Sequence, residues 1–470
     1  KTRVTALLTN VKAYAGSSLV YDYQLTYDLG TTTHYSRLTK VTLCDGSGNC
    51  LAPTEFGWQG TKDNIGASTL TADFEAGKWL YGDFDGDGLV DAAKGNETVT
   101  YSSDHSYASL NLILGSNTSS DRKTSSLSLV YARQPYSGPE LLGLLDTTGR
   151  GIDDFYYLQN YGYRSPTDGH DVLMYTVYHA KNNGDFTATR MDNNLDIITS
   201  DDSCCKTHLY NYLGDFNGDG RQEYFGYLSN GDGNLGDDPA HPRSTSYGDY
   251  TQTGDFDGDG CTDILSQTGE NRVVSYSCNP AVASAEGLYL WGKLSPVLGD
   301  FNGDGMTDVL LLTSSGGGWL YYSTGIGFVE SSYEVPSSFE GAENSNVLES
   351  TGHVIYASDV NGDGRSDIIE IASDAVSVYL STGDGFALSA KLSATYSTES
   401  SYSTTMGDYN NDGIPDVMVG SSVYVFTYTP EFITTIKNGI GVTTSISYDR
   451  LNKNGDFYTK CPNDPSKYLC

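Results

Sequence analysis

Basic residues are scarce in this 470-residue chain: Lys and Arg together number 27, against 60 Asp and Glu, and the formal net charge is −33. Nucleic-acid binding depends on Lys and Arg side chains that neutralise phosphates, so this balance excludes nucleic acid as a partner. No run of 18 or more apolar residues occurs, which argues against a membrane-spanning helix. Helical periodicity of useful length is also missing.

Recognisable catalytic motifs are absent as well. The sequence contains no HExxH motif, no GxSxG nucleophile elbow and no CxxC zinc spacing. We therefore expect no enzymatic activity, and a glycosidase-type pair of carboxylates on another face is the enzymatic alternative. The seven histidines are scattered: His34, His105, His170, His179, His208, His241 and His353.

Glycine and tyrosine are abundant, with 54 and 37 residues respectively. Gly-rich turns between runs of Tyr, Val and Thr are typical of strands joined by tight loops. The fold class is therefore predicted to be all-β, and the length allows a large core or several domains.

An acidic nine-residue loop, DFNGDGMTD at 300–308, is the most informative segment. Asp300, Asn302, Asp304 and Asp308 occupy positions one, three, five and nine, and Gly305 occupies position six. Oxygen ligands at alternate positions of a tight turn can converge on one hard cation, and calcium is the usual one. Glycine permits the left-handed backbone that such a turn needs.

The same pattern recurs in five more loops, so about six calcium ions are predicted, which would bring the net charge to about −21. The carbonyl at position seven is a further expected ligand. The other side-chain ligands are Asp83, Asp85, Asp87, Asp91, Asp215, Asn217, Asp219, Glu223, Asp255, Asp257, Asp259, Asp263, Asp359, Asn361, Asp363, Asp367, Asp408, Asn410, Asp412 and Asp416. The expected carbonyl ligands are Leu89, Arg221, Cys261, Met306, Arg365 and Ile414.

Acidic loops of this kind also occur in EF-hands and as surface turns without metal. An EF-hand needs flanking helices and an acidic residue at position twelve, and only Glu370 among the six loops meets the second requirement. The EF-hand reading therefore fails. Acidic surface turns without metal are the other alternative, but several carboxylates packed into one turn repel each other unless a cation is present.

A seventh loop at 146–154 is degenerate. Asp146 and Asp154 keep positions one and nine and Gly151 keeps position six, but Thr148 and Arg150 replace two ligands. The guanidinium of Arg150 can pair with the remaining carboxylates. This loop is predicted to have lost its ion and kept its turn.

Eight cysteines with short local spacings suit an oxidising compartment. Three local pairs are predicted, and the two remaining cysteines would then form a vicinal bridge. Long-range pairing and free thiols are the alternatives. The local pairs are Cys44–Cys50, Cys261–Cys278 and Cys461–Cys470, and the vicinal pair is Cys204–Cys205.

The loops start 40 to 69 residues apart, a spacing typical of propeller blades. Each loop leads into a strand, and several periods end in Gly-Phe, as in LYYSTGIGF. A four-stranded blade fits this length and must stack on its neighbours. We predict a β-propeller over residues 63–430, with seven blades most favoured and six or eight as alternatives. Residues 1–62 and 431–470 are predicted as flanking β segments, the second containing a hairpin with a turn at Asn438-Gly439.

The loops, with Gly-Asp-Phe before them and Gly-Phe after the next strands, resemble FG-GAP repeats (integrin-α-like, also called VCBS), which form calcium-bound β-propellers. This resemblance covers about residues 70–430. The phrases YQLTYDL, HYSRLTKVTLCDGSGNCLAPTEFGWQ and ITTIKNGIGVTTSISYDRL resemble the flanks of Rhs-type proteins and of the B component of bacterial Tc insecticidal toxins. That resemblance implies a propeller set in a toxin-enclosing shell that docks on a translocation channel. The eight cysteines and the lack of YD repeats depart from it.

The sequence thus favours a non-enzymatic, calcium-stabilised docking module of a secreted bacterial protein, with a protein partner. The alternative is a secreted lectin or adhesin that binds cell-surface glycans through the propeller face. Packing within the fold is favoured for Tyr161, Tyr163, Tyr210 and Tyr212, and stacking on a sugar or a protein partner is their alternative. Most of a second aromatic group is expected to pack within the fold: Tyr289, Trp291, Trp319, Tyr321 and Tyr322. The N-terminus shows no signal-peptide pattern, and we expect the chain to be part of a longer protein.

Overall fold

All regular structure in the described part of the chain is β-strand, which confirms the predicted all-β class. The computed structural model describes residues 7–30, 33, 35–59, 64–71, 80–82, 91–95, 100–101, 106–114, 123–131, 140–146, 153–164, 171–182, 188–190, 195–197, 213–224, 227–229, 235–237, 251–268, 271–279, 285–289, 295–313, 315–339, 354–372, 374–393, 404–410, 412–419, 422–428 and 431–448. Among these residues no helix has the length and apolarity needed to cross a lipid bilayer.

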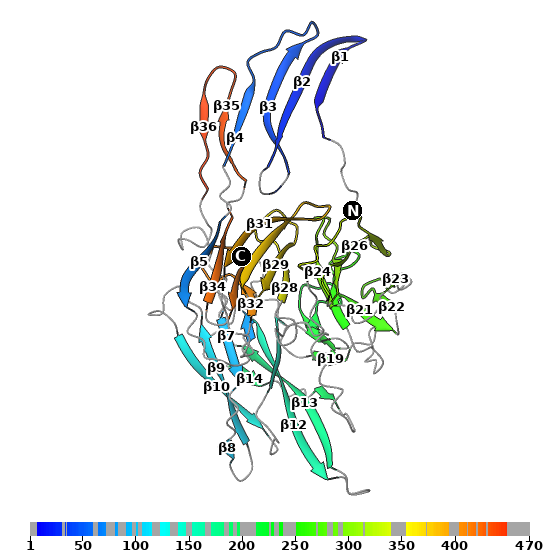
Figure 1. The fold of residues 1–470 in the computed structure, drawn as a ribbon, viewed down its shortest axis with the longest axis vertical. Helices are drawn as coiled ribbons and strands as arrows, with labels where there is room; N and C mark the ends of the chain where they lie inside the picture. The colour runs from blue at the N-terminus through cyan, green and yellow to red at the C-terminus, as the bar shows by residue number, and fades with distance from the viewer. Residues whose placement is uncertain are drawn as a thin grey trace.

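The two flanking segments form a single antiparallel sheet of six strands, which stands apart at one end of the molecule (Figure 1). The sequence predicted both segments as β structure but not that they pair. Strand β4 pairs with β35, so the chain leaves this sheet and returns beside the same strand. The strands, in spatial order, are β1 (Asn10–Ala15), β2 (Ser18–Leu29), β3 (Ser36–Asp45), β4 (Thr54–Trp58), β35 (Ile433–Lys437) and β36 (Thr443–Ser445).

The predicted hairpin of the second flanking segment and the predicted disulfide Cys44–Cys50 of the first both lie in the six-stranded sheet. The turn 438–442 is longer than the expected Asn438-Gly439 pair: Asn438 N donates to Val442 O, and Gly441 takes a φ of 90°. The turn after β3 is closed by a disulfide between Cys44 and Cys50, as predicted.

The middle of the chain forms a series of small antiparallel sheets. Three regular four-stranded sheets follow each other in sequence and in space (Figure 1). They consist of β20 (Thr251–Gly254), β21 (Asp263–Thr268), β22 (Asn271–Ser275) and β23 (Ala285–Tyr289); of β24 (Ser295–Gly299), β25 (Asp308–Leu312), β26 (Gly318–Ser323) and β27 (Phe328–Glu330); and of β28 (Val354–Ser358), β29 (Asp367–Ala372), β30 (Ala375–Ser381) and β31 (Phe386–Ser393).

A fourth four-stranded sheet joins the two ends of this region. Its first three strands are β32 (Thr404–Gly407), β33 (Asp416–Val419) and β34 (Ser422–Thr427), and its outer strand is β5 (Asn64–Thr71) from the start of the region. Strand β32 also contacts β6 (Leu80–Gly82), which belongs to the first repeat. The last sheet is therefore completed by the chain segment that enters the region.

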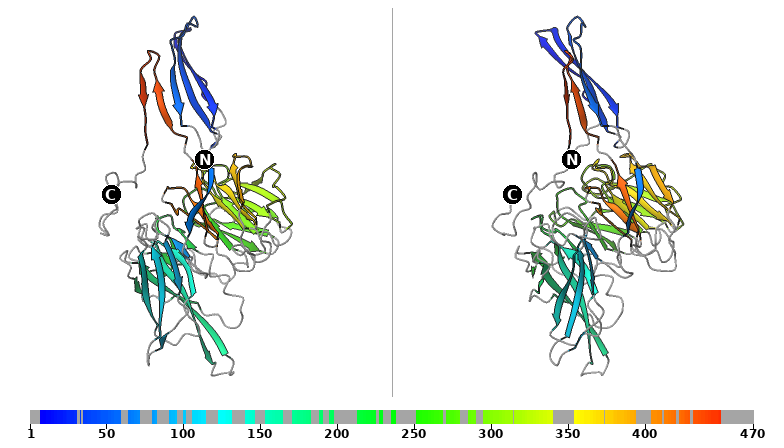
Figure 2. Two further views of the ribbon diagram at one scale, coloured as in Figure 1. Left: turned by 60° about the vertical axis from the view of Figure 1, so that its left-hand side comes forward. Right: turned by 90° about the vertical axis from the view of Figure 1, so that its left-hand side faces the viewer.

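The earlier repeats are less regular. Two five-stranded sheets contain the longest described strands of the repeat region, and β12 and β13 extend away from the six-stranded sheet (Figure 2). The first has β6 (Leu80–Gly82), β7 (Asp91–Gly95), β8 (Thr100–Tyr101), β9 (Ser106–Leu114) and β10 (Lys123–Tyr131); the second has β11 (Glu140–Leu145), β12 (Asp154–Arg164), β13 (Asp171–Asn182), β14 (Ala188–Arg190) and β15 (Leu195–Ile197). Two short pairs follow: β16 (Leu213–Gly214) with β17 (Glu223–Tyr224), and β18 (Tyr227–Ser229) with β19 (Leu235–Asp237).

The apolar core lies between consecutive sheets. Strand β25 is buried along its whole length, which explains its continuous apolar run DVLLL where a half-exposed strand would alternate. Its odd and even residues face different neighbours: Val309 and Leu311 pack with β21 and β22, whereas Leu310 and Leu312 pack with Ile368 of β29. A third cluster joins β29 and β30 to β33 and β34. Each sheet therefore depends on the next one for burial.

Candidate metal centres

Each acidic loop is the connection between the first and second strands of its sheet. The residue before position one pairs with position nine across the hairpin, as Gly299 does with Asp308 and Gly254 with Asp263. The strands thereby fix both ends of the loop, and in the loops 215–223, 255–263, 300–308 and 359–367 positions one to eight form a tight turn between them. The sequence predicted this placement correctly for the strand that follows the loop.

The aspartate at position one folds the turn around its own side chain. In the loop 300–308, Asp300 Oδ1 accepts hydrogen bonds from Gly303 N at 2.7 Å and Asp304 N at 3.1 Å, and Oδ2 accepts from Gly305 N at 2.6 Å. Gly303 and Gly305 have φ angles of 77° and 81°, a region that favours glycine. Asp215, Asp255 and Asp359 make the same three bonds in their loops.

The carboxylate at position nine is fully buried and fixes the loop to the sheet. Asp308 Oδ2 accepts a hydrogen bond from Phe301 N at 2.9 Å, and Oδ1 accepts one from Ser323 N at 2.8 Å. Burial raises the pKa of Asp308 to about 8 and that of Asp263 to about 7. A buried carboxylate in such surroundings is stabilised in its charged form by a nearby cation.

The side chains of two loops bring three carboxylates close enough to share an ion. One oxygen each from Asp215, Asp219 and Glu223 lies within 4.8 Å of the others, and the same holds for Asp255, Asp257 and Asp263. Calcium accepts oxygen ligands at 2.3–2.6 Å, so oxygens at this separation can contact one ion. The donor set contains only oxygen at these positions, which fits calcium. A third group, Asp259 with Cys261 and Cys278, does not qualify because its sulfurs form a disulfide.

The loops 408–416 and 83–91 and the degenerate loop 146–154 are described only in part. In the loop 408–416, Asp408 Oδ2 accepts from Gly413 N at 2.6 Å, and burial raises the pKa of Asp416 to about 8. Of the loop 83–91 only Asp91 is described, and it is buried. Arg150 of the degenerate loop, and Cys204, Cys205, Cys461 and Cys470, lie outside the described residues.

Consecutive loops are joined by a recurring backbone hydrogen bond. In four described loops the amide N–H at position eight donates to the carbonyl at position one of the preceding loop, over 2.6 to 3.1 Å. The degenerate loop takes part, because Gln222 N donates to Asp146 O and Asp146 N donates to Gln222 Oε1. The other three pairs are Thr262 with Asp215, Thr307 with Asp255 and Ser366 with Asp300. Pro415 at the last position eight has no N–H and cannot continue the series.

Sequence reasoning missed a second connection, the serine of the recurring Ser-Thr-Gly segment. Ser323 Oγ donates to Phe256 O, and Ser381 Oγ donates to Phe301 O at 2.6 Å. Each serine lies at the end of a third strand and reaches position two of the preceding loop. The signal was present, since STG occurs at 323–325 and again at 381–383.

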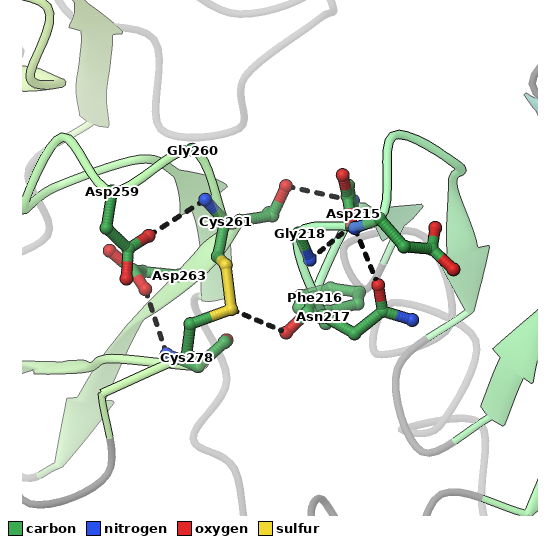
Figure 3. The surroundings of a disulfide bond; sticks show 12 residues. Asp215, Phe216, Asn217, Gly218, Asp259, Gly260, Cys261, Asp263 and Cys278 are labelled. Atoms are coloured by element: carbon green, nitrogen blue, oxygen red, sulfur yellow. Dashed lines mark hydrogen bonds between the residues drawn. A yellow bond between two sulfur atoms is a disulfide. The ribbon is translucent and has the colours of Figure 1, made fainter.

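The predicted disulfide between Cys261 and Cys278 is confirmed and lies at a junction of two loops (Figure 3). Cys261 is position seven of its loop, and Cys278 Sγ lies 3.6 Å from Phe216 O of the preceding loop. A Cβ added to Gly218 would approach Cys261 Sγ to 2.8 Å. The disulfide therefore packs directly on the loop of the preceding repeat.

The aromatic candidates fall into two groups. Trp319 on β26 is 43% exposed and is therefore not among the aromatic residues buried in the fold, while Tyr321 and Tyr322 are half-buried. The Tyr321 hydroxyl lies 3.5 Å from Glu330 Oε2. The side chains of Tyr161, Tyr163 and Tyr289, and all of Trp291, Tyr210 and Tyr212, lie outside the description.

A profile of the FG-GAP-like repeat family matches residues 359–419, so the chain contains an FG-GAP-like repeat in this segment. The match begins at the position-one aspartate of one loop and ends after the strand that follows the next loop. Comparison with curated protein sequences gave no significant match.

Several solved structures are similar at low identity. One is an Agrocybe aegerita lectin described as specific for non-reducing terminal N-acetylglucosamine, with a TM-score of 0.35 at 14% identity over 70% of this chain and 98% of the lectin. Another is the TcdB2–TccC3–Cdc42 complex, with a TM-score of 0.42 at 14% identity over 92% of this chain and 18% of that one. TcdB2–TccC3 without its hypervariable C-terminal region gives a TM-score of 0.41 at 14% identity, over 92% of this chain and 18% of that chain. The chain thus spans about a fifth of the length of the TcdB2–TccC3 chains.

Proposed function

We propose that residues 63–430 form a seven-bladed β-propeller whose acidic loops bind calcium, and that this propeller is a non-enzymatic docking module of a secreted, Rhs/Tc-toxin-like protein. The observation that carries the proposal is the repeated bond from position eight of one loop to position one of the preceding loop. The same bond at four successive junctions gives the five sheets that it joins the same relation to their neighbours. A closed ring requires that successive sheets repeat the same geometry and that the last sheet is joined to the start of the region. The pairing of β5 with β34 meets the second requirement.

Calcium would be held by side-chain oxygens at positions one, three, five and nine and by the carbonyl at position seven. The ion supplies positive charge to carboxylates that otherwise repel one another in a buried turn. The chain itself fixes both loop ends and the position-one turn, so the ligands are arranged before the ion arrives. Such sites are structural: they stabilise the loop ends on which the contacts between sheets depend.

Two measurements test these steps in turn. Calcium binding is tested by titration calorimetry and by anomalous diffraction from calcium-soaked crystals, with scattering expected in the loops 215–223, 255–263 and 300–308. Docking is tested in the intact protein by deleting residues 64–428, with β4 joined directly to β35. We expect this deletion to abolish co-elution with the channel component of the same toxin. Unchanged co-elution would refute the docking role.

Glycan binding is the second candidate, and the exposure of Trp319 is the observation that favours it. An exposed indole can stack on an apolar sugar face. Glycan binding is supported if a glycan array gives a signal that depends on calcium and is lost in Trp319→Ala. An array without any signal would eliminate this candidate.

A further inference from the structure

The side chain at position seven of an acidic loop packs on the glycine at position four of the preceding loop. A Cβ added to that glycine would come within 2.8 to 3.0 Å of the position-seven side chain at three junctions. The chemistry of this side chain nevertheless changes from one junction to the next: a disulfide sulfur, a thioether and a guanidinium. The pairs are Cys261 on Gly218, Met306 on Gly258 and Arg365 on Gly303.

Arg365 is the unusual member of this series because it is a buried cation, only 3% exposed. Its Nη2 atom donates to Asp363 Oδ2 within the loop and to Thr33 O in the turn between β2 and β3. Its Nε atom donates to Ser381 O at 3.3 Å. The guanidinium also lies over the ring of Tyr35, 4.5 Å from the ring centroid. One side chain thus contacts both the repeat region and the six-stranded sheet.

The turn between β2 and β3 makes further contacts around this arginine. The Tyr35 hydroxyl donates to Asp363 O at 2.8 Å, so the tyrosine contacts the acidic loop directly. On the other side, Thr33 Oγ1 donates to Glu431 Oε2 at 2.5 Å, and Arg37 lies 3.5 Å from Glu431 Oε1. The turn is therefore held between the loop 359–367 and the chain segment that leads into β35.

The same contacts make the loop 359–367 a poor fit for calcium. Asp363 Oδ2 accepts from both Arg365 and Asn361 Nδ2, the latter at 3.2 Å, and Oδ1 accepts from Arg365 N at 2.9 Å. A divalent ion at position five would lie beside a buried guanidinium, and like charges at such a distance repel strongly. In the loop 300–308 the corresponding residue is Met306, which brings no charge.

We propose that the loop 359–367 binds the β2–β3 turn of the six-stranded sheet in place of a calcium ion, with Arg365 as the cation that both partners share. The guanidinium neutralises Asp363, as calcium would in a neighbouring loop, and the same Nη2 atom also donates to Thr33 O. The interface between the flanking sheet and the repeat region is therefore built on a converted metal loop. This inference rests on the proposed function only in treating the other acidic loops as calcium sites.

Arg221 provides a matched comparison. It also occupies position seven, and its Nη1 lies 3.2 Å from Asp219 Oδ2 of its own loop. Both side chains of that pair are 36% exposed, and a solvated pair of this kind contributes little and yields readily to a metal ion. Substitution of Arg221 should therefore leave the flanking sheet unaffected.

The test compares Arg365→Met with Arg221→Met in the full chain. Bound calcium per chain is counted by elemental analysis after dialysis against 1 mM calcium, and exchange of the β2–β3 turn is followed by hydrogen–deuterium exchange. For Arg365→Met we expect about one more ion than in the wild-type protein and turn exchange faster by about tenfold. Arg221→Met should show neither change. An Arg365→Met protein with wild-type ion count, or with wild-type turn exchange, overturns the proposal.

Two further variants keep the result interpretable. Arg365→Lys retains the charge but loses the forked donor geometry, so we expect faster turn exchange without an additional ion. Tyr35→Phe removes the bond to Asp363 O and keeps the ring over the guanidinium, so exchange should rise while the ion count stays constant. If no variant and no wild-type sample binds calcium, the calcium proposal fails on its own, and the exchange measurements still decide whether Arg365 holds the turn.

Discussion

The glycines before the loops 215–223, 255–263 and 300–308 lie where the following sheet leaves no room for a side chain. A Cβ on Gly254 would lie 2.8 Å from Thr307 Cγ2, and one on Gly299 would lie 2.7 Å from Ser366 Cβ. Both contacts involve the position-eight residue of the next loop. The Gly-Asp pair of the repeat is therefore a packing requirement between sheets as well as part of a proposed calcium loop.

Gly254→Ala is expected to destabilise the fold by about 1–3 kcal/mol, because the new methyl group overpacks a filled junction. Thermal or urea unfolding measures the loss. Gly327→Ala is the control, since a Cβ at that position meets no atom within 4 Å. Removing Thr307 Cγ2 and Oγ1 in the double variant Gly254→Ala/Thr307→Ala should restore part of the loss. Additive losses in that double variant would contradict the contact.

Asp308 and Asp304 belong to one loop but have separable roles. Asp308→Ala leaves two backbone N–H groups, of Phe301 and Ser323, without their acceptor, at about 1–3 kcal/mol each. We expect this loss to persist in chelator, as measured by urea unfolding, and to be larger with calcium because position nine is also a proposed calcium ligand. Asp304→Asn removes a ligand charge and should lower stability only when calcium is present. Equal behaviour of the two variants would show that position nine is a ligand without a structural role.

The acidic loops and the strands that follow them could be predicted because their signals are local. Alternate acidic residues, a glycine at position six and an apolar run such as DVLLL are enough to place a turn before a buried strand. The serine connection at Ser323 was harder to recognise, because its partner, Phe256 O, belongs to a different repeat. Its meaning depends on which sheets become neighbours, which spacing along the chain does not reveal.

Long-range pairing set the other limit on prediction. Strand β5 completes a sheet with β34, and β4 pairs with β35, although each pair is separated by the whole repeat region. The residues of a strand do not identify its partner strand, so these pairings cannot be predicted from the sequence of either strand alone. The sequence likewise predicts Arg365 only as a backbone-carbonyl ligand, because Thr33 and Tyr35, which contact its side chain, are remote in sequence.

Reducing the Cys261–Cys278 disulfide is expected to lower the free energy of unfolding by about 3 kcal/mol, given a sequence separation of 17 residues. A Cys261→Ser/Cys278→Ser variant measured by calorimetry tests this value. The matched control is Cys44→Ser/Cys50→Ser, which opens a turn with a separation of only 6 residues and should cost about 2 kcal/mol. Only the first variant should also speed amide exchange in the loop 215–223, because Cys278 contacts Phe216.

Calcium removal is expected to lower the melting temperature of the whole repeat region in one cooperative step. The core is shared between consecutive sheets, so a loosened loop weakens its neighbours too. A site with a dissociation constant of about 10⁻⁴ M contributes about 1.4 kcal/mol at about 1 mM calcium. Calorimetry with calcium, magnesium and chelator measures the effect, and magnesium should substitute poorly. A melting curve that does not respond to chelator would contradict the calcium assignment.

The pairing of β4 with β35 means that the polypeptide departs from the six-stranded sheet and comes back to it at neighbouring positions. Everything between them is topologically a long excursion from a hairpin-like site. By topology alone, this excursion can be lengthened, shortened or removed without altering the order of the strands in the six-stranded sheet. A change in the number of repeat sheets would then leave the pairing of β4 with β35 intact.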